Sequence, residues 1–440
     1  MERTRHSHRC SRPAAAVIAL VLAGAAAAAE GPATHTIGKP PRSYEALLPP
    51  GQSQGAALVV FLHGTNEPKL DRFKTDYGPL LRQRKCVVAL PQASDKLKWR
   101  YEDAQHILDV VADVQKRYGT DPKRVVLMGV SGGGQTALFL VDHAPQRWRA
   151  VIAVSTNPVV IRGRRHEWFY PPAETVKTCP YLAINHITQG AAIQYWRQVR
   201  VRREPQGASL SILPVLGPVS HYLPPPRELG PWLDEVLAGR HPKPLPDPQK
   251  EAVAKMFAAC VAALPKAIDE AKPAEKTAPF AKDGELFALT LNAPSDFGRS
   301  GKEDKADTAD KPITQIRAEH AKWPIRLRCE ARKRAELMTD VLKAEEQQTL
   351  ARGLLYQVYH TGSVTAGKRA WQIRIGSITY PDKTRGWVST LFLHAAAPIA
   401  GSPKQWLEVS LLDETQQPDA RELAAVVRTV LETVSAKGRE

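Results

Sequence analysis

A serine between closely spaced glycines is the strongest chemical signal in this sequence. Gly129, Ser131 and Gly133 form a Gly-x-Ser-x-Gly pattern between an apolar run at 125–128 and a helical pattern at 135–143. A serine at such a strand-to-helix turn is held in a strained backbone, with its hydroxyl exposed at the carboxyl end of a sheet. The context therefore predicts a nucleophile. The alternative is a Gly/Ser-rich turn that only joins a strand to a helix.

Attack by Ser131 on a carbonyl would form an oxyanion, which two backbone amides are expected to stabilise. The amide of Gly132 lies at the start of the predicted helix, where the helix dipole favours negative charge. The second amide is predicted at Thr65, because His63 and Gly64 end the apolar run at 57–62 and glycine allows the chain to turn. His63 is interpreted as a structural turn residue rather than a base.

A general base must take the proton of the serine hydroxyl, and His221 is the best placed of the thirteen histidines. It lies after the apolar run at 210–216 and before a helical pattern at 227–237. This order places it on a loop at the carboxyl end of the last strand. His186, on the loop after the preceding strand, is the reserve candidate.

The elements that must position these residues alternate along residues 56–239. Short apolar runs, typical of strands buried on both faces, are separated by longer helical patterns. The alternation predicts an α/β fold over residues 35–242, with a mostly parallel sheet and helices on both faces. Strands are expected at 57–62, 87–90, 125–128, 150–154, 181–184 and 210–216, and helices at 104–118, 135–143, 191–199 and 227–237.

The chain divides near residue 245, within a proline-rich stretch at 241–248. Residues 243–282 are predicted to form a Pro/Lys/Ala-rich linker with a helix at 250–271. Residues 283–440 are predicted to form a smaller α+β accessory domain of unknown role. Its expected elements are a charged segment at 295–311, a helix around 314–349, strands near 354–360, 371–378, 387–394 and 406–412, and a closing helix at 419–434. Its strand tryptophans are interpreted as core residues: Trp371, Trp387 and Trp406.

Residues 55–240 resemble the α/β-hydrolase superfamily. Within them, residues 109–131 look like the secreted feruloyl esterases and polyhydroxybutyrate depolymerase-like enzymes, in which a helix and an Asp-Pro turn lead into the serine strand. The resemblance implies a carboxylesterase-like serine hydrolase, with an acyl-enzyme on Ser131 and His221 as general base. It also implies a small-molecule or polymer ester as the substrate.

The sequence departs from that family at the acid that orients the base. The family's acid usually follows the strand before the histidine, but residues 184–190 contain no carboxylate and Gln189 occupies the expected position. Three outcomes remain open. Glu167 or Glu174 reaches the histidine, a Ser131–His221 dyad works slowly, or the chain is a non-catalytic binding or scaffold protein on a degenerate hydrolase fold.

The net charge of +16 raises nucleic acid, an anionic membrane surface or an acidic substrate as partners. Residues 30–246 carry +10 of this charge. Their later connections contain an arginine cluster that is expected either to attract an anionic ester substrate or to form a solvated basic face: Arg162, Arg164, Arg165, Arg197, Arg200, Arg202 and Arg203. Trp168, Phe169 and Tyr170 are expected either to line an acyl pocket or to pack a loop onto the sheet.

Other chemistries lack their sequence signals. There is no phosphate-binding loop, dinucleotide fingerprint or basic run with interleaved aromatics, so we expect no nucleotide or nucleic-acid partner. No Cys/His spacing suits a metal, and neither a metal nor another cofactor is expected. Cys86 and Cys179 are expected to be buried thiols, whereas Cys260 and Cys329 could pair with each other.

Residues 1–29 are predicted to be a secretory signal peptide. Arg3, Arg5, Arg9 and Arg12 precede an apolar run at 14–29 that ends in three alanines. The run is shorter than the roughly twenty residues that a stable membrane span needs. We therefore expect an exported protein, periplasmic or secreted, whose mature chain begins near Glu30. An uncleaved anchor is the alternative.

Overall fold

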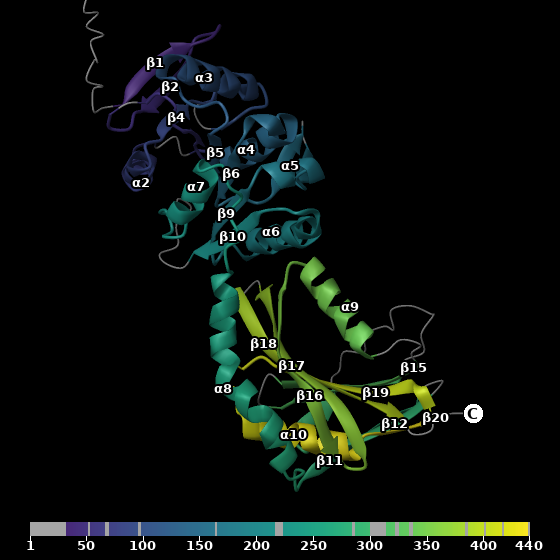
Figure 1. The fold of residues 1–440 in the computed structure, drawn as a ribbon. Coiled ribbons are helices and arrows are strands. Elements are labelled where there is room, and N and C mark those ends of the chain that lie inside the picture. Colours follow the sequence, from purple (N-terminus) through teal and green to yellow (C-terminus); the bar gives the residue numbers. More distant parts are fainter. Residues whose placement is uncertain are drawn as a thin grey trace, which may run out of the picture.

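Two units, joined by the long helix α8 (Pro248–Glu270), make up the computed structural model (Figure 1). The structure describes residues 32–51, 53–66, 70–95, 98–162, 165–215, 223–283, 287–299, 314–321, 325–333, 338–382, 386–399, 402–415 and 418–438. Within these ranges no helix is both long and apolar enough to cross a membrane.

The first unit is built on an eight-stranded sheet in the order β1-β2-β4-β3-β5-β6-β9-β10. Strands from β4 to β10 pair in parallel, and β1 and β2 add an antiparallel edge. Every residue of β3 and β5 is buried, which explains their continuous apolar sequences. The strands are β1 (Ala33–Ile37), β2 (Arg42–Leu47), β3 (Leu58–Leu62), β4 (Val87–Pro91), β5 (Val125–Val130), β6 (Ala150–Val154), β9 (Tyr181–His186) and β10 (Leu210–Val215).

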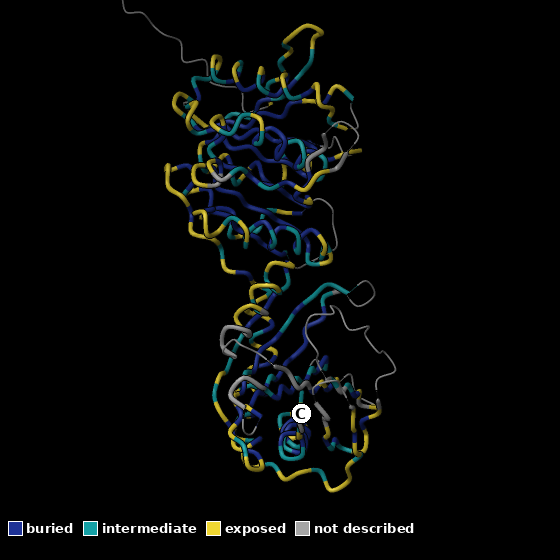
Figure 2. The backbone as a smooth tube through the Cα atoms, turned by 90° about the vertical axis from the view of Figure 1, so that its right-hand side faces the viewer, coloured by how far each residue is buried: buried dark blue, intermediate teal, exposed yellow. Residues whose placement is uncertain are grey.

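Helices cover both faces of this sheet, and the buried chain forms its middle layer (Figure 2). One face packs against α3 (Asp103–Tyr118), α4 (Gly132–His143) and α6 (Gly190–Arg203). The other face packs against α1 (Leu70–Asp76), α2 (Gly78–Gln83) and α7 (Leu229–Leu237). The predicted α/β fold is confirmed, with all six expected strands and all four expected helices.

The sequence analysis missed several elements of the first unit. The edge strands β1 and β2 are short and only partly buried, so they lack the continuous apolar run of a central strand. An antiparallel hairpin of β7 (Val159–Arg162) and β8 (Arg165–Trp168) follows β6, and the short helix α5 (Ala173–Thr178) precedes β9.

The second unit is a sheet-rich α+β region. A seven-stranded antiparallel sheet has the order β13-β14-β15-β19-β18-β17-β16, and a three-stranded sheet has the order β11-β12-β20. Helix α8 and helix α10 (Ala420–Thr433) bury apolar residues in its core, while α9 (Met338–Ala351) borders a cavity on another face of the large sheet. The strands are β11 (Thr277–Asp283), β12 (Phe287–Pro294), β13 (Phe297–Arg299), β14 (Thr314–His320), β15 (Ile325–Lys333), β16 (Leu355–Ala366), β17 (Arg369–Asp382), β18 (Gly386–Ile399), β19 (Ser402–Asp413) and β20 (Ser435–Gly438).

The structure corrects part of the expected second half. The helix expected around 314–349 is wrong over its first half, where β14 and β15 lie. In β15, Leu327 and Cys329 are buried while Arg326 and Arg328 are exposed, an alternation with the period of a strand. Strand β11 lies where a linker was expected, and α8 contributes Phe257 to the core. The four later strands and the closing helix are confirmed.

The four described cysteines are buried free thiols. Cys86 and Cys179 are buried as expected, and burial raises the pKa of Cys86 to about 11 and that of Cys179 to about 12. Cys260 and Cys329 belong to the same hydrophobic core, but the expected alternative of a disulfide between them is wrong. These buried thiols therefore act as small apolar side chains.

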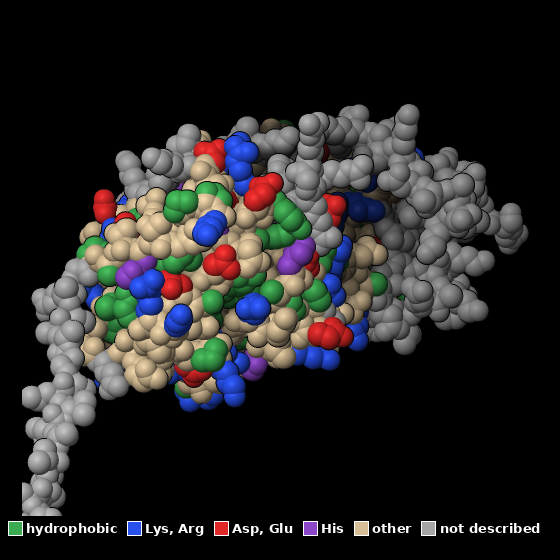
Figure 3. All heavy atoms as spheres, turned by 90° about the horizontal axis from the view of Figure 1, so that it is seen from above, with side chains coloured by type: hydrophobic (Ala, Val, Ile, Leu, Met, Phe, Trp, Pro, Cys, Tyr) green, Lys and Arg blue, Asp and Glu red, His purple; other side chains and the backbone are tan. Residues whose placement is uncertain are grey.

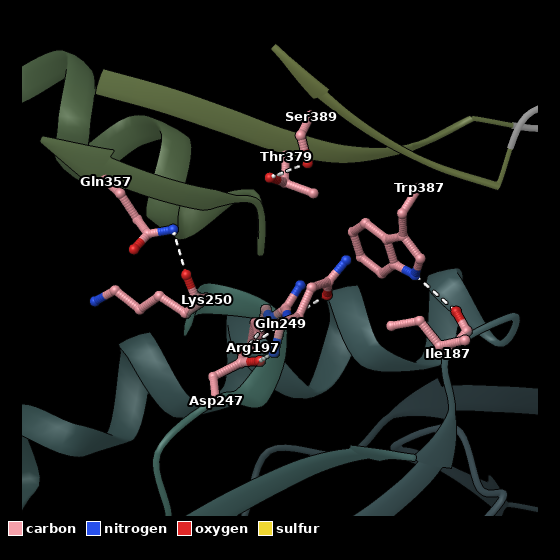
Figure 4. A network of polar contacts seen from close by, with 9 residues as sticks. All are labelled: Ile187, Arg197, Asp247, Gln249, Lys250, Gln357, Thr379, Trp387 and Ser389. Carbon is pink, nitrogen blue, oxygen red and sulfur yellow. Dashed lines mark hydrogen bonds and ion pairs between the residues drawn. The ribbon is translucent and has the colours of Figure 1, made fainter. Parts of the chain in front are cut away.

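A buried ion pair ties α6 to the start of α8. Arg197 donates from Nε and Nη2 to Asp247 Oδ2 at 3.0 and 2.7 Å, and from Nη2 to Gln249 Oε1 at 2.8 Å (Figure 4). Asp247 Oδ1 also accepts the Gln249 amide at 3.1 Å and so caps α8. Both charged side chains are only 2% exposed. Arg197 therefore lies buried where α6 meets the start of α8, and it does not belong to a solvated basic face.

Asp247→Ala is expected to lower the free energy of unfolding by about 3–5 kcal/mol, because it leaves the Arg197 charge buried and unpaired. The measurement is urea unfolding of the mature chain. The matched control is Glu235→Ala, which breaks the solvent-exposed Arg240–Glu235 pair and is expected to change the free energy of unfolding far less, because water screens that pair. Equal losses for the two variants would contradict a structural role for the buried pair.

Candidate active site

Ser131 forms the turn between β5 and α4 in a backbone conformation that few residues other than glycine adopt. Its φ is 52° and its ψ is −118°. The Ser131 amide donates to Val154 O at 2.9 Å, and the Ser131 carbonyl accepts from the Gln135 amide at 3.0 Å and from Thr156 Oγ1 at 3.3 Å. Neighbouring elements therefore hold the strained turn on both sides.

The glycines around Ser131 are required by close backbone packing. A Cβ on Gly129 would lie 2.4 Å from the carbonyl of Gly133, and a Cβ on Gly133 would lie 2.2 Å from Leu62 O. No side chain fits either position unless β3, β5 and α4 move apart. This packing accounts physically for the spacing seen in the sequence.

The structure brings the two predicted oxyanion donors together beside Ser131. A Cβ built on Gly132 would lie 3.5 Å from the Thr65 amide nitrogen, and one on Gly64 would lie 3.7 Å from Ser131 Cβ. Gly132 is the first residue of α4, so its amide has no acceptor within the helix. The two amides can therefore serve one negative oxygen near Ser131.

His63 supports this turn as a structural residue. It is 2% exposed, its Nδ1 is 2.9 Å from Gly64 O, and its ring centroid lies 4.8 Å from that of Trp99. Trp99 Nε1 donates to the His63 carbonyl at 2.8 Å. Burial lowers the pKa of His63 and keeps its ring neutral near pH 7.

A pocket of about 350 Å³ opens next to Ser131. Its walls come from residues that follow β5, β6 and β9, because the carboxyl ends of parallel strands meet at one edge of a sheet. Within the described part of the chain, no aspartate, glutamate, lysine or arginine lines it. Its lining is Ser131, Gln135, Ser155, Thr156, Asn157, Thr188, Gln189, Gly190, Ala191 and Ala192.

The sequence analysis missed most of this lining. Ser155 directly follows β6 with a φ of 48°, and its hydroxyl is buried with no hydrogen-bond partner among the described residues. Thr156 Oγ1 donates to Val154 O at 2.7 Å, and the Thr156 carbonyl accepts Trp196 Nε1 at 2.7 Å. Their position directly after a predicted strand was the available signal, since that strand ends at the same edge as Ser131.

The predicted base lies outside the described residues. His221 is in the undescribed segment 216–222, which begins where β10 ends. Val215, the last residue of β10, pairs with His186 at the end of β9, so this segment starts at the sheet edge that carries Ser131. The role of His221 therefore stays a prediction. The reserve candidate, His186, is 3% exposed, and its Nδ1 lies 2.7 Å from Thr188 Oγ1.

Of the three candidates for the acid or orienting group, only Gln189 lines the pocket. Gln189 Oε1 accepts from Asn185 Nδ2 at 3.2 Å and from the His186 amide at 3.0 Å, which closes the turn before α6. Glu167 lies on β8 and Glu174 on α5, both with exposed side chains and neither in the pocket lining. The structure thus brings together Ser131, Gly132, Thr65 and Gln189.

The described side chains of the basic cluster do not line this pocket. Arg200, Arg202 and Arg203 lie in the last turn of α6, roughly 15–20 Å along the helix from Gly190. Arg202 lies 4.6 Å from the Tyr170 ring centroid. At the end of the molecule seen in Figure 3, basic and acidic side chains are interspersed. The Arg162 and Arg165 side chains, and all of Arg164, lie outside the described part.

The aromatic segment after β6 packs against the first unit. Phe169 is 2% exposed within the core, and the half-exposed Trp168 contacts Tyr195 of α6, with ring centroids 3.8 Å apart and the planes tilted by 38°. None of the three aromatic residues lines the serine pocket. Packing of a loop is therefore the alternative that the structure favours.

The sheet order, with its parallel centre and the serine turn after β5, decides the fold of the first unit. The first unit has the α/β-hydrolase fold. The family model described as the prolyl oligopeptidase family matches residues 92–169, which include Ser131. This α/β-hydrolase unit is joined to a second unit that the family match does not reach.

Solved structures with partial similarity include several esterases and hydrolases. A thermostable esterase is 16% identical, with 47% of this chain aligned to 60% of that chain and a TM-score of 0.35. The 2,6-dihydroxy-pseudo-oxynicotine hydrolase is 15% identical over 50% of this chain and 71% of its own, with a TM-score of 0.38. Est1E from Butyrivibrio proteoclasticus, bound to ferulic acid, is 13% identical over 46% of this chain and 96% of its own, with a TM-score of 0.33. No curated protein matches the sequence.

The stability of the fold is expected to fall in mild acid. Burial lowers the pKa of His63 and that of His106 below their ordinary value of 6.5. The unfolded chain therefore binds more protons as the pH falls, and the free energy of unfolding decreases below about pH 6.5. Urea unfolding between pH 7.5 and 5 is the measurement.

His63→Gln is expected to flatten this pH dependence, because it removes a group whose pKa is lower in the folded chain than in the unfolded chain. His143→Gln is the control, since the His143 side chain is 44% exposed. If the free energy of unfolding of His63→Gln falls with pH as steeply as that of the wild type, the buried ring does not contribute to the loss of stability in acid.

Proposed function

We propose that the first unit is a serine hydrolase that cleaves carboxylic esters through an acyl-enzyme on Ser131. The observation that carries the proposal is the strained Ser131 turn, which faces a pocket and has the amides of Gly132 and Thr65 beside it. The fold and the match to a peptidase family support hydrolysis in general. The choice of esters rests on the resemblance seen in the sequence.

The proposed reaction has two steps. His221 takes the Ser131 hydroxyl proton while Oγ attacks the ester carbonyl, and the amides of Gly132 and Thr65 stabilise the resulting oxyanion. Collapse of this intermediate breaks the bond to the alcohol, which leaves with the proton from His221. Water then attacks the acyl-enzyme with His221 again as base, and releases the acid and free Ser131.

The pocket chemistry favours uncharged esters. Hydroxyl and amide groups from Thr156, Asn157, Thr188 and Gln189 line the wall, with no charged side chain among the described residues. A charged acyl group would lose its hydration there without gaining an opposite charge. We therefore propose short neutral esters rather than anionic ones as the substrate class.

One observation favours a second function, a non-catalytic binding protein on the same fold. Among the described residues that line the pocket there is no carboxylate, and the oxygen of Gln189 is already engaged by the turn before α6. Without an acid, the imidazolium formed during attack is less stabilised, and turnover is slower. A direct test of Ser131 reactivity distinguishes the two functions.

The mature protein is expected to react with a fluorophosphonate probe and to hydrolyse p-nitrophenyl acetate. Ser131→Ala should abolish labelling and lower kcat/KM by at least about 10³-fold, because the nucleophile is removed. Ser363→Ala, at an exposed serine on β16 of the second unit, is the matched control and should keep both activities. Intact mass and the labelled peptide are the readouts.

Labelling that persists in Ser131→Ala would exclude Ser131 as the nucleophile. A folded wild-type protein that neither labels nor turns over would favour the binding protein instead. Thermal unfolding of Ser131→Ala, matched to wild type, checks that loss of labelling is chemical and not a loss of fold.

We further propose, from the sequence alone, that residues 1–29 direct export and are removed. Expression of the full chain in a bacterial host should yield a mature protein that starts near Glu30, measured by amino-terminal sequencing of the exported fraction. An Arg-rich amino terminus retained on the product would contradict cleavage.

A further inference from the structure

Helix α6 is covered on two faces, whereas a surface helix with a single apolar stripe packs on one. Ala192, Ile193, Trp196 and Val199 are buried against the first unit. Gly190, Gln194, Arg197 and Gln198, spaced at i, i+4, i+7 and i+8, share another face, which meets the second unit. Helix α6 therefore belongs to both units, and its first residues also line the serine pocket.

The turn after α9 lies directly on α6. Gln194 and Gln198 donate from Nε2 to the Arg352 carbonyl at 2.8 and 3.0 Å. Gly353 has a φ of 72°, and a Cβ there would lie 2.0 Å from the Gln194 carbonyl oxygen. Only glycine permits this backbone approach, so the second unit packs closely against the middle of α6.

Trp387, the second residue of β18, makes the contact at the beginning of α6. Its Nε1 donates to the Ile187 carbonyl at 2.7 Å, and the Arg197 guanidinium lies 5.1 Å from its ring centroid (Figure 4). A Cβ on Gly190 would lie 3.5 Å from Trp387 Cε2 and 3.0 Å from Pro381 Cβ. The indole thus lies beside the turn that leads from β9 into α6.

This turn forms one wall of the serine pocket. Ile187 immediately precedes Thr188, Gln189 and Gly190, and all three of these line the pocket. The Ile187 amide donates to Val215 O at 3.0 Å, where β10 ends and the chain enters the segment that contains His221. Ile187 therefore links Trp387, through its carbonyl, to the pocket wall and, through its amide, to the end of β10.

We propose that Trp387 is a positioning residue for the serine pocket, through which the second unit holds the 187–190 wall in place. The role rests on the proposed function of Ser131. Trp387 does not touch the reacting atoms. Its indole N–H satisfies the Ile187 carbonyl, and its ring blocks outward movement at Gly190. Loss of either contact loosens the wall and weakens the placement of a substrate against Ser131.

The first test measures the wall without any requirement for catalysis. Hydrogen exchange of the peptide that spans residues 187–190 is compared in wild type, Trp387→Phe and Trp387→Ala. Loss of one hydrogen bond is expected to speed exchange by about three- to tenfold in Trp387→Phe, and more in Trp387→Ala. The matched control is Trp371→Phe, which changes a fully buried tryptophan on β17 whose Nε1 has no partner among the described residues.

The second test measures the consequence for Ser131. In Trp387→Phe, the KM for p-nitrophenyl acetate is expected to rise about three- to tenfold while kcat changes less than about twofold, because the wall positions substrate and leaves the nucleophile intact. Gly190→Ala, which pushes against Pro381 from the other side, should act in the same direction. Trp371→Phe should leave KM at the wild-type value.

The outcomes separate the two proposals. Exchange at 187–190 that is the same in Trp387→Phe and Trp371→Phe overturns the positioning role, whether or not the protein is an enzyme. Faster exchange with an unchanged KM also overturns it and leaves Trp387 as a structural contact. A wild type that fails to label overturns the proposed function, while exchange still reports whether Trp387 holds the wall. If Trp387→Ala does not fold, the comparison of Trp387→Phe with Trp371→Phe alone tests the positioning role.

Discussion

The close approach of β3, β5 and α4 around Ser131 is the constraint on which the candidate site depends. Glycines at 129 and 133 let these backbones come closer than any side chain would allow, and the approach forces Ser131 into a positive φ. The same contact places the Gly132 amide beside Thr65. Main-chain packing therefore fixes the Ser131 turn and sets the two amides beside it, whereas the proposed base and the pocket wall come from segments that follow other strands.

Helix α6 connects the serine pocket to the second unit. Its amino end lines the pocket, one face belongs to the hydrolase core, and another face carries Arg197 into the buried pair with Asp247. Desolvation opposes the charge of Arg197 and lowers its pKa, while the carboxylate of Asp247 compensates. Because α6 contacts both units, the second unit can act on the serine pocket although none of its described residues lines that pocket.

Elements that depend on local pattern were predictable, and those that depend on packing were not. The buried strands β3, β5, β6, β9 and β10 are continuous apolar runs and were found. A helix was predicted where β14 and β15 lie, because these strands carry many charged residues and lack a continuous apolar run. Trp387 was expected in the core, but it is only half buried and lies against the first unit. A single strand does not reveal which surface will cover it.

The sequence by itself determined that a serine lies at a strand-to-helix turn in an α/β fold, because glycine spacing and apolar periodicity are local properties. It also determined which half of the chain carries most of the positive charge. Only the tertiary structure decided that Arg197 is buried and that Gln189 closes the turn before α6. It likewise placed a tryptophan 200 residues after Ile187 in a hydrogen bond to the Ile187 carbonyl, next to the pocket wall. These facts depend on contacts between segments that are distant in the sequence, and such contacts produce no periodic pattern in the sequence of either segment.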